Sequence, residues 1–211
     1  TKVHLEVQKH AQKGRDIILI GHKGHPEVIG TLGRHPSNSN TKIYLVENND
    51  DIKKLEISSS EVAYVTQTTL SVDETRELIN SLKEKFPGII GPSADDICYA
   101  TQNRQDAVKQ LSLECQIVLV IGSQTSSNSN RLKELAEKCG TKSFLIDDKT
   151  DIDLNSLKDA TSVGITAGAS APEEIVQEVI SFLVPLGFNT VRNLSENNEN
   201  MTFKLPKELT S

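Results

Sequence analysis

Ile17-Ile18-Leu19-Ile20-Gly21 is an apolar, mostly β-branched run that ends in glycine, and Leu119-Val120-Ile121-Gly122 repeats it about 100 residues later. Two further pairs of runs recur in the same order and at the same interval: 42–46 with 142–146, and 62–66 with 162–166. Short runs of this kind are typical of buried strands. Their shared order indicates that the chain contains two copies of one structural unit.

Helical patterns connect these strands in both copies. Residues 2–13 and 102–114 are amphipathic and precede the first strand of each copy, and residues 130–138 form a further helix that stops before Gly140. Strands that alternate with helices and are buried on both faces favour parallel sheets. The sequence therefore predicts an α/β fold with two repeated units and parallel sheets.

A helix is also expected after the third strand of each copy. Ser71 and Glu74 have the spacing of a capping box, and Ser170 and Glu173 repeat that spacing. Pro172 fits early in the second of these helices, where a missing N–H costs nothing.

The repeat sets the domain organisation. We expect one α/β unit over residues 1–93 and a second over 94–183, with the prolines and glycines of residues 86–92 marking the boundary. Residues 184–211 fall outside the repeat. Residues 201–205 alternate like a single strand, which needs a sheet to join. Neither of the two units obviously lacks a strand.

Composition argues against several classes of protein. Lys and Arg number 23 against 29 Asp and Glu, so the net charge is −6 and no basic nucleic-acid-binding face is expected. No apolar run approaches the roughly 20 residues of a membrane span, and the start lacks a secretory signal pattern. The three cysteines are widely spaced and make no disulfide framework. This favours a reducing compartment, either the cytoplasm or, after removal of a transit peptide, the plastid stroma.

The loops at the carboxyl ends of the strands carry the candidate chemistry, because ligands of parallel α/β sheets bind there. These loops are rich in hydroxyls, amides, glycines and helix N-termini: 21–27, 66–69, 123–130 and 166–170. Such groups suit an anion such as a phosphate or diphosphate. Any one loop is better explained by ordinary caps and turns, but four at equivalent places favour a site.

Histidines gather in the first of these loops. The spacing of His22, His25 and Glu27 fits no standard zinc arrangement, and the more natural interpretation is a charge-assisted donor and a proton path beside an anion site. The other three histidines are expected on helix surfaces or in loops: His4, His10 and His35.

The three cysteines are expected to differ in role. Cys115 precedes a buried strand and Cys139 lies in a last helical turn, and both positions favour packing. Cys98 lies among polar residues at the start of the second unit. The pattern alone leaves Cys98 open between an inert and a functional thiol.

Taken together, the loops resemble the LytB/IspH family, the 4-hydroxy-3-methylbut-2-enyl diphosphate reductases of the methylerythritol phosphate route to isoprenoids. The resemblance rests on six motifs in one order: GHKGHPEV (21–28), TQTTLSVD (66–73), DICYATQNRQ (96–105), SSNSNRL (126–132), TAGASAP (166–172) and LPKEL (205–209). It extends over essentially the whole chain.

The resemblance implies three α/β units around a pseudo-threefold axis and a central 4Fe-4S cluster held by three cysteines, one per unit, of which Cys98 is one. It implies that His25 binds the diphosphate, that Glu27 relays protons to the allylic hydroxyl, and that Thr68 orders that hydroxyl and a water. The other diphosphate ligands that it implies are Ser126, Ser127, Asn128 and Ser170.

The implied reaction is the two-electron reductive removal of water from an isoprenoid diphosphate substrate, which gives isopentenyl and dimethylallyl diphosphate. The resemblance also implies an electron donor such as flavodoxin or ferredoxin as a partner.

The family pattern has three units, whereas this sequence shows two. The resemblance therefore implies that the first unit and its cysteine lie outside this sequence, and the repeat puts a further cysteine about three or four residues before Thr1. We then expect the chain alone to hold no cluster and to be inactive, and residues 184–211 to pack on the first unit. The alternative hypothesis is a truncated, non-enzymatic module that binds a diphosphate.

Overall fold

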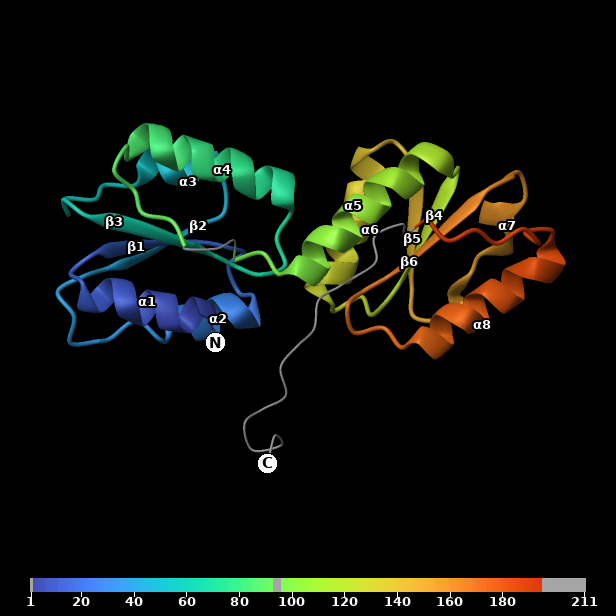
Figure 1. Ribbon diagram of the computed structural model, residues 1–211, viewed down its shortest axis with the longest axis horizontal. Coiled ribbons are helices and arrows are strands. Elements are labelled where there is room, and N and C mark those ends of the chain that lie inside the picture. The colour runs from blue at the N-terminus through green and yellow to red at the C-terminus, as the bar shows by residue number, and fades with distance from the viewer. Residues whose placement is uncertain (1, 93–95, 195–211) are drawn as a thin grey trace, which may run out of the picture.

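The computed structural model describes residues 2–92 and 96–194, and it contains two three-stranded sheets with helices on both faces of each (Figure 1). The first sheet and its helices are, in chain order, α1 (Lys2–Gln12), β1 (Asp16–Ile20), α2 (Pro26–Leu32), β2 (Ile43–Val46), α3 (Asn49–Lys54), β3 (Val62–Thr66) and α4 (Val72–Lys85). The second set is α5 (Tyr99–Glu114), β4 (Ile117–Ile121), α6 (Ser127–Lys138), β5 (Lys142–Ile146), η1 (Lys149–Asp151), α7 (Leu154–Leu157), β6 (Val163–Ala167), α8 (Glu173–Leu183) and η2 (Val184–Leu186).

Both sheets have the same topology. The strand orders are β2-β1-β3 and β5-β4-β6, and every strand pair is parallel. Asp16 lies opposite Val62 in the first sheet, and Ile117 lies opposite Val163 in the second, which are equivalent places in the sequence repeat. The predicted α/β fold with two repeated parallel sheets is confirmed.

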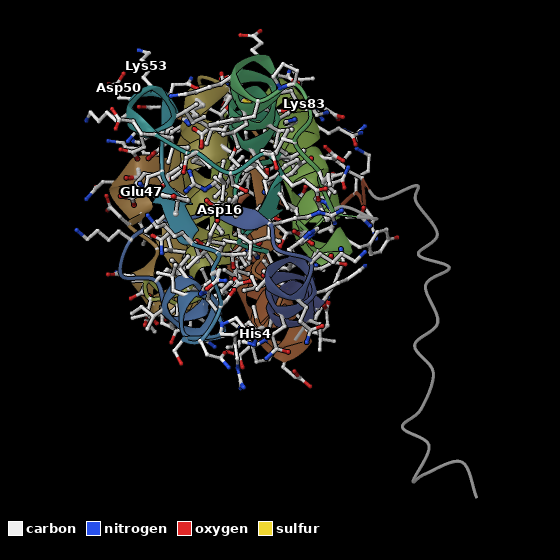
Figure 2. All side chains as sticks on the ribbon, turned by 90° about the vertical axis from the view of Figure 1, so that its left-hand side faces the viewer. His4, Asp16, Glu47, Asp50, Lys53 and Lys83 are labelled. Carbon is white, nitrogen blue, oxygen red and sulfur yellow. The ribbon has the colours of Figure 1, made fainter. Side chains whose placement is uncertain are left out.

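The helices form a layer on each side of a buried central strand. Every residue of β1, β3 and β4 is buried. Figure 2 shows His4 of α1 on one side of the first sheet, Asp50 and Lys53 of α3 on the other, and Asp16 of β1 between them. The buried carboxylate of Asp16 accepts a hydrogen bond from the N–H of Lys42 at 2.8 Å, so it holds the start of β2 against β1.

A glycine after the central strand lets the next helix approach closely in each unit. A Cβ on Gly21 would lie 2.6 Å from Cγ2 of Val28, and a Cβ on Gly122 would lie 2.3 Å from Oγ of Ser129. Because these separations are too short for atoms in contact, a side chain at either position would push the helix off its sheet. The first turns of α2 and α6 therefore lie directly at the strand ends.

Some helix boundaries differ from the sequence prediction. α5 and α6 begin earlier than predicted, because Cys98 and Ser126 accept hydrogen bonds from N–H groups of the first turn and cap these helices. The short elements α2, α3, η1, α7 and η2 were not predicted, since fewer than two helical turns carry no periodic pattern.

The caps of the two helices that follow the third strands also differ. Ser71 accepts a hydrogen bond from the N–H of Glu74, as predicted. The predicted cap at Ser170 is wrong: α8 begins after Pro172, whose side chain makes no cap hydrogen bond, and Ser170 lies earlier in an exposed turn. Gly140 ends the α6 segment with a φ of 86°, as its predicted C′ role requires.

Two side chains lie in unexpected surroundings. His10 was predicted on a surface or in a loop, but it is only 3% exposed, because it falls on the face of α1 that carries Val3 and Val7 against the sheet. Cys139 was predicted to pack but is exposed at the end of α6. Cys115 is partly buried against the cluster around Leu111, as predicted.

Some predictions concern residues that the structure does not describe. The strand predicted at 201–205, most of the tail and Thr1 lie outside the described residues. The division of the chain at 93/94 stays a prediction. Among the helices of residues 2–92 and 96–194, none is long and apolar enough to cross a membrane.

Buried His10 predicts a pH dependence of stability. Burial lowers the pKa of His10, Glu6 partly offsets this, and Arg15, Lys9 and Lys13 lower it further. The folded chain therefore keeps His10 neutral at pH values where the unfolded chain takes up a proton. We expect the free energy of unfolding to fall as the pH drops below about 6.5. Urea unfolding between pH 7.5 and 5 should show a shallower fall for His10→Leu than for the wild type. Equal slopes would contradict this assignment. His4 and His22, whose pKa values are also lowered by burial, contribute to the slope that remains in the variant.

The packing of α6 predicts the effect of a small substitution. A Cβ on Gly168 would lie 2.2 Å from Oγ of Ser129, so we expect Gly168→Ala to destabilise the protein by about 1–3 kcal/mol in urea unfolding. Adding Ser129→Ala should recover part of that loss by removing the clashing oxygen. Gly88→Ala is the control, because nothing lies within 4 Å of a Cβ there, and it should change stability by less than about 0.5 kcal/mol. Equal losses for Gly168→Ala and Gly88→Ala would refute the packing argument.

Candidate functional site

The site begins where β1 passes into α2. After Gly21 the chain turns through His22 and Lys23 to His25, which is the N-cap of α2. Nδ1 of His25 accepts a hydrogen bond from the N–H of Glu27 at 3.2 Å. His25 and Glu27 are thus held side by side in the first turn of the helix, both partly buried.

Glu27 reaches from α2 to the end of β3. Its two carboxylate oxygens accept hydrogen bonds from the N–H and the Oγ1 hydroxyl of Thr68, each at 3.0 Å. A carboxylate held by two donors has a fixed orientation. The structure therefore brings together Glu27 and Thr68, two residues that sequence reasoning had placed in separate loops.

Cys98 lies against the same strand end. Its N–H donates to the carbonyl oxygen of Thr68 at 3.2 Å, and its side chain caps α5. The Sγ atom shares a hydrogen bond with Oγ1 of Thr101 at 2.9 Å and lies 3.4 Å from the N–H of Thr101. Cys98, Thr68 and Glu27 therefore form one continuous chain of contacts.

Asp96 holds this segment against β3 and α1. The side chain of Asp96 is fully buried, and it accepts hydrogen bonds from the N–H of Thr66 at 3.0 Å and from Nζ of Lys2 at 2.9 Å. No role was predicted for Asp96, although it lies two residues before Cys98 in the motif at 96–105. A carboxylate that binds one strand end and one distant helix leaves no periodic signal in the sequence.

The N-terminus of α6 completes the site from the second unit. Ser126 is its N-cap, and Ser127 shares a hydrogen bond with Oγ1 of Thr69 at 3.0 Å. Asn128 is only 6% exposed, and within the described residues neither its side-chain nitrogen nor its oxygen has a hydrogen-bond partner. Leaving such groups buried and unpaired is costly, so Asn128 has the character of a residue that awaits a polar ligand.

Ser170 is the predicted site residue that the structure does not join to the others. It is exposed in the turn before α8, and no hydrogen bond links its side chain to the α6 terminus among the described residues. The seven remaining predicted residues lie at the carboxyl ends of β1 and β3 or at the start of α5 and α6: His25, Glu27, Thr68, Cys98, Ser126, Ser127 and Asn128.

Charges from both units meet beside this site. Burial and the neighbouring Arg131 guanidinium lower the pKa of His22, and Glu47, Glu134 and Glu74 partly offset this. Burial alone would raise the pKa of Glu74, but Lys138, Arg131 and His22 outweigh burial, and the carboxyl pKa lies below its usual range. Glu74 is therefore an anion, and His22 is neutral near pH 7.

The described residues do not form a metal centre by themselves. They contain no group of three or more His, Cys, Asp or Glu side chains that could hold a metal ion. Cys98 and Cys115 lie at opposite ends of α5, which is 16 residues long, so about 24 Å of helix separates them. Cys139 likewise lies at the far end of α6 from Ser126. Among the described residues, Cys98 is therefore the one cysteine that lies at this site.

Comparison with known proteins points to one family. The family described as LytB protein matches residues 1–184. The 4-hydroxy-3-methylbut-2-enyl diphosphate reductases of Saccharophagus degradans and Alcanivorax borkumensis are 55% and 54% identical over 99% of this chain and 68% of their own length.

A solved structure of the E-1-hydroxy-2-methyl-but-2-enyl-4-diphosphate reductase from Plasmodium falciparum superimposes with a TM-score of 0.89 at 37% identity, over 98% of this chain and 65% of that one. The chain thus spans about two thirds of the length of the proteins that it matches. The fold, the motifs and these matches agree, and the chain belongs to the LytB protein family.

Proposed function

We propose that this chain provides two of the three units of a 4-hydroxy-3-methylbut-2-enyl diphosphate reductase. The enzyme would remove the allylic hydroxyl as water, with two electrons and two protons, to give isopentenyl and dimethylallyl diphosphate. The observation that carries the proposal is the line of contacts from Cys98 through Thr68 to Glu27. It sets a candidate metal ligand beside a candidate proton donor.

The anion-binding part of the proposal rests on two helix N-termini. In this proposal His25 at the start of α2 and Ser126, Ser127 and Asn128 at the start of α6 bind the diphosphate oxygens, and Ser170 joins them from the turn before α8. Free N–H groups and the helix dipole favour negative charge at such ends. The unpaired amide of Asn128 supports this assignment, because a diphosphate oxygen would satisfy its N–H groups.

The chemical end of the site would lie at β3. In this proposal the Thr68 hydroxyl orders the substrate hydroxyl and a water, and Glu27 delivers a proton to the departing oxygen. Cys98 would be one of three cysteines that hold a 4Fe-4S cluster, which supplies electrons and a Lewis-acidic iron when bound. Flavodoxin or ferredoxin is the proposed class of electron donor.

The outer face of the first unit supports the presence of a third unit. On α5, the buried Gln105 bonds to the backbone of Leu70 and Val72 and so seats the second unit on the first. His4 of α1 has the equivalent place in the repeat, but it lines an open cavity of about 330 Å³ that also borders Glu27 and Thr68. We propose that another unit covers this face, where the exposed apolar side chains include Leu5 and Ile29.

The proposal predicts which form of the protein holds the cluster. Anaerobic reconstitution with iron and sulfide should load no stoichiometric cluster on the 211-residue chain, because it offers one thiolate at the site. A form extended to the length of its relatives should load one, as read by its visible absorbance. In that longer form Cys98→Ser should abolish stable loading and Cys139→Ser should leave it unchanged. A stoichiometric cluster on the 211-residue chain would contradict the three-unit assignment.

The proposal also predicts a catalytic loss at Glu27. In the cluster-loaded longer form, Glu27→Gln should lower kcat by at least about 100-fold, because the amide cannot relay a proton, while the KM changes little. Oxidation of a reduced viologen dye by the substrate provides the measurement. Glu84→Gln, at an exposed position on α4, is the matched control and should keep full activity. A Glu27→Gln variant with normal kcat would remove Glu27 from the mechanism.

A second candidate function is diphosphate binding without catalysis, which the unpaired Asn128 side chain favours as much as it favours the enzyme. Absence of turnover in a longer form that carries its cluster, together with tight pyrophosphate binding, would select this candidate.

A further inference from the structure

Arg131 joins the two units beside the anion site. It lies in the second turn of α6, and its side chain is 14% exposed. Its Nη2 donates to Nε2 of His22 at 2.8 Å, across the gap between the units. Its Nη1 lies 2.6 Å from a carboxylate oxygen of Glu134 and 3.5 Å from one of Glu74. The guanidinium is thus held on three sides, two of them formed by the first unit.

The direction of the bond between Arg131 and His22 follows from chemistry. A guanidinium stays charged and can only donate, so Nε2 of His22 must accept. His22 is then a neutral imidazole with its proton on Nδ1. The charge of Arg131 and the burial of His22 both favour this form.

A second connection runs from the same turn to the same helix. The N–H of His22 donates to Oε1 of Gln67 at 3.0 Å, and Nε2 of Gln67 donates to Oγ1 of Thr69 at 3.0 Å. Thr69 in turn bonds to Ser127. Ser127 and Arg131 are one helical turn apart on α6, so the turn that carries His22 is linked to that helix at two successive points.

The internal repeat shows that the fold itself does not need an arginine here. Gly30 lies as many residues after Gly21 as Arg131 lies after Gly122. α2 packs on its sheet with glycine at this position, so the helix and sheet form without the cation. The role of Arg131 therefore lies outside the packing of the helix on its sheet, and it belongs to the second unit alone.

We propose that Arg131 is a positioning residue of the anion site. By holding the turn of His22 against α6, it sets the spacing between the side chain of His25 and the N-terminus of α6 at Ser127. A bound diphosphate would bridge these two groups, and its affinity would depend on that spacing. The proposal rests on the proposed function, because it takes a diphosphate as the ligand.

The contact between Arg131 and His22 can be tested without any ligand. Nitrogen-15 NMR of the five imidazoles of the 211-residue chain should show His22 as the Nδ1–H tautomer with a lowered pKa, assigned by its loss in His22→Gln. In Arg131→Met the pKa of His22 should rise and the Nε2–H tautomer should appear. Arg131→Lys keeps the charge and should keep most of the pKa shift. Lys133→Met is the matched control, since it removes a cation that pairs with Glu137 on the same helix.

The positioning role is tested by calorimetry with inorganic pyrophosphate. Arg131→Met should weaken binding by about tenfold, and Lys133→Met should change it less than twofold. The effects of Arg131→Met and His22→Gln should not add, because both break one contact. Thermal unfolding and the retained signals of the other histidines check that each variant folds.

The two hypotheses fail in different ways. Absence of pyrophosphate binding by the wild-type chain would count against the diphosphate site itself, and with it the positioning role. Binding by the wild type that persists unchanged in Arg131→Met, while the His22 signal shifts, would overturn the positioning role alone and leave the proposed function standing. Weaker binding with an unshifted His22 signal would also overturn it, because Arg131 would then act directly.

Discussion

The close contact between a strand-end glycine and the next helix is the constraint on which the rest of the molecule depends. Gly122 lets Ser129 approach so closely that the first turn of α6 lies at the edge of its sheet, where it meets the loops of the first unit. Gly21 does the same for α2, and this brings the carboxylate of Glu27 within reach of Thr68. A single added carbon at either glycine would move a helix away from the groups that it has to meet.

The two copies of the unit use this shared geometry for different chemistry. Glu27 and Asn128 occupy equivalent places in the first turns of α2 and α6. One copy therefore presents a carboxylate that is held by two donors, and the other presents a buried amide with unpaired atoms. The two copies share one backbone arrangement, and their different residues give the two helix ends complementary character, one suited to protons and the other to anions.

The sequence was informative wherever a feature recurs or is periodic. The duplicated apolar runs predicted both sheets and their parallel order, and the polar loops predicted that strand ends and helix starts carry the site, while the family resemblance supplied the individual residues. Ser170 failed as a cap because spacing alone does not show that Pro172 precedes the first turn. The pairing of His22 with Arg131 joins residues 109 positions apart, and no local pattern encodes such a contact. The burial of His10 was missed because histidine is on average only partly buried, and its place on the apolar face of α1 was given too little weight.

Cys98 begins a helix of the second unit, yet it is fastened to the first. Its N–H binds Thr68, and the nearby Asp96 binds Thr66. The thiol of Cys98 and the carboxylate of Glu27 are therefore both attached to the end of β3. The hydrogen bonds of Ser127 and Arg131, in contrast, run from α6 of the second unit to residues of the first unit. If the units swing apart, the distance between thiol and carboxylate is preserved while the opposite end of the site widens. The end of the site at β3 therefore keeps its geometry in such a motion, whereas the end at α6 depends on how the two units pack.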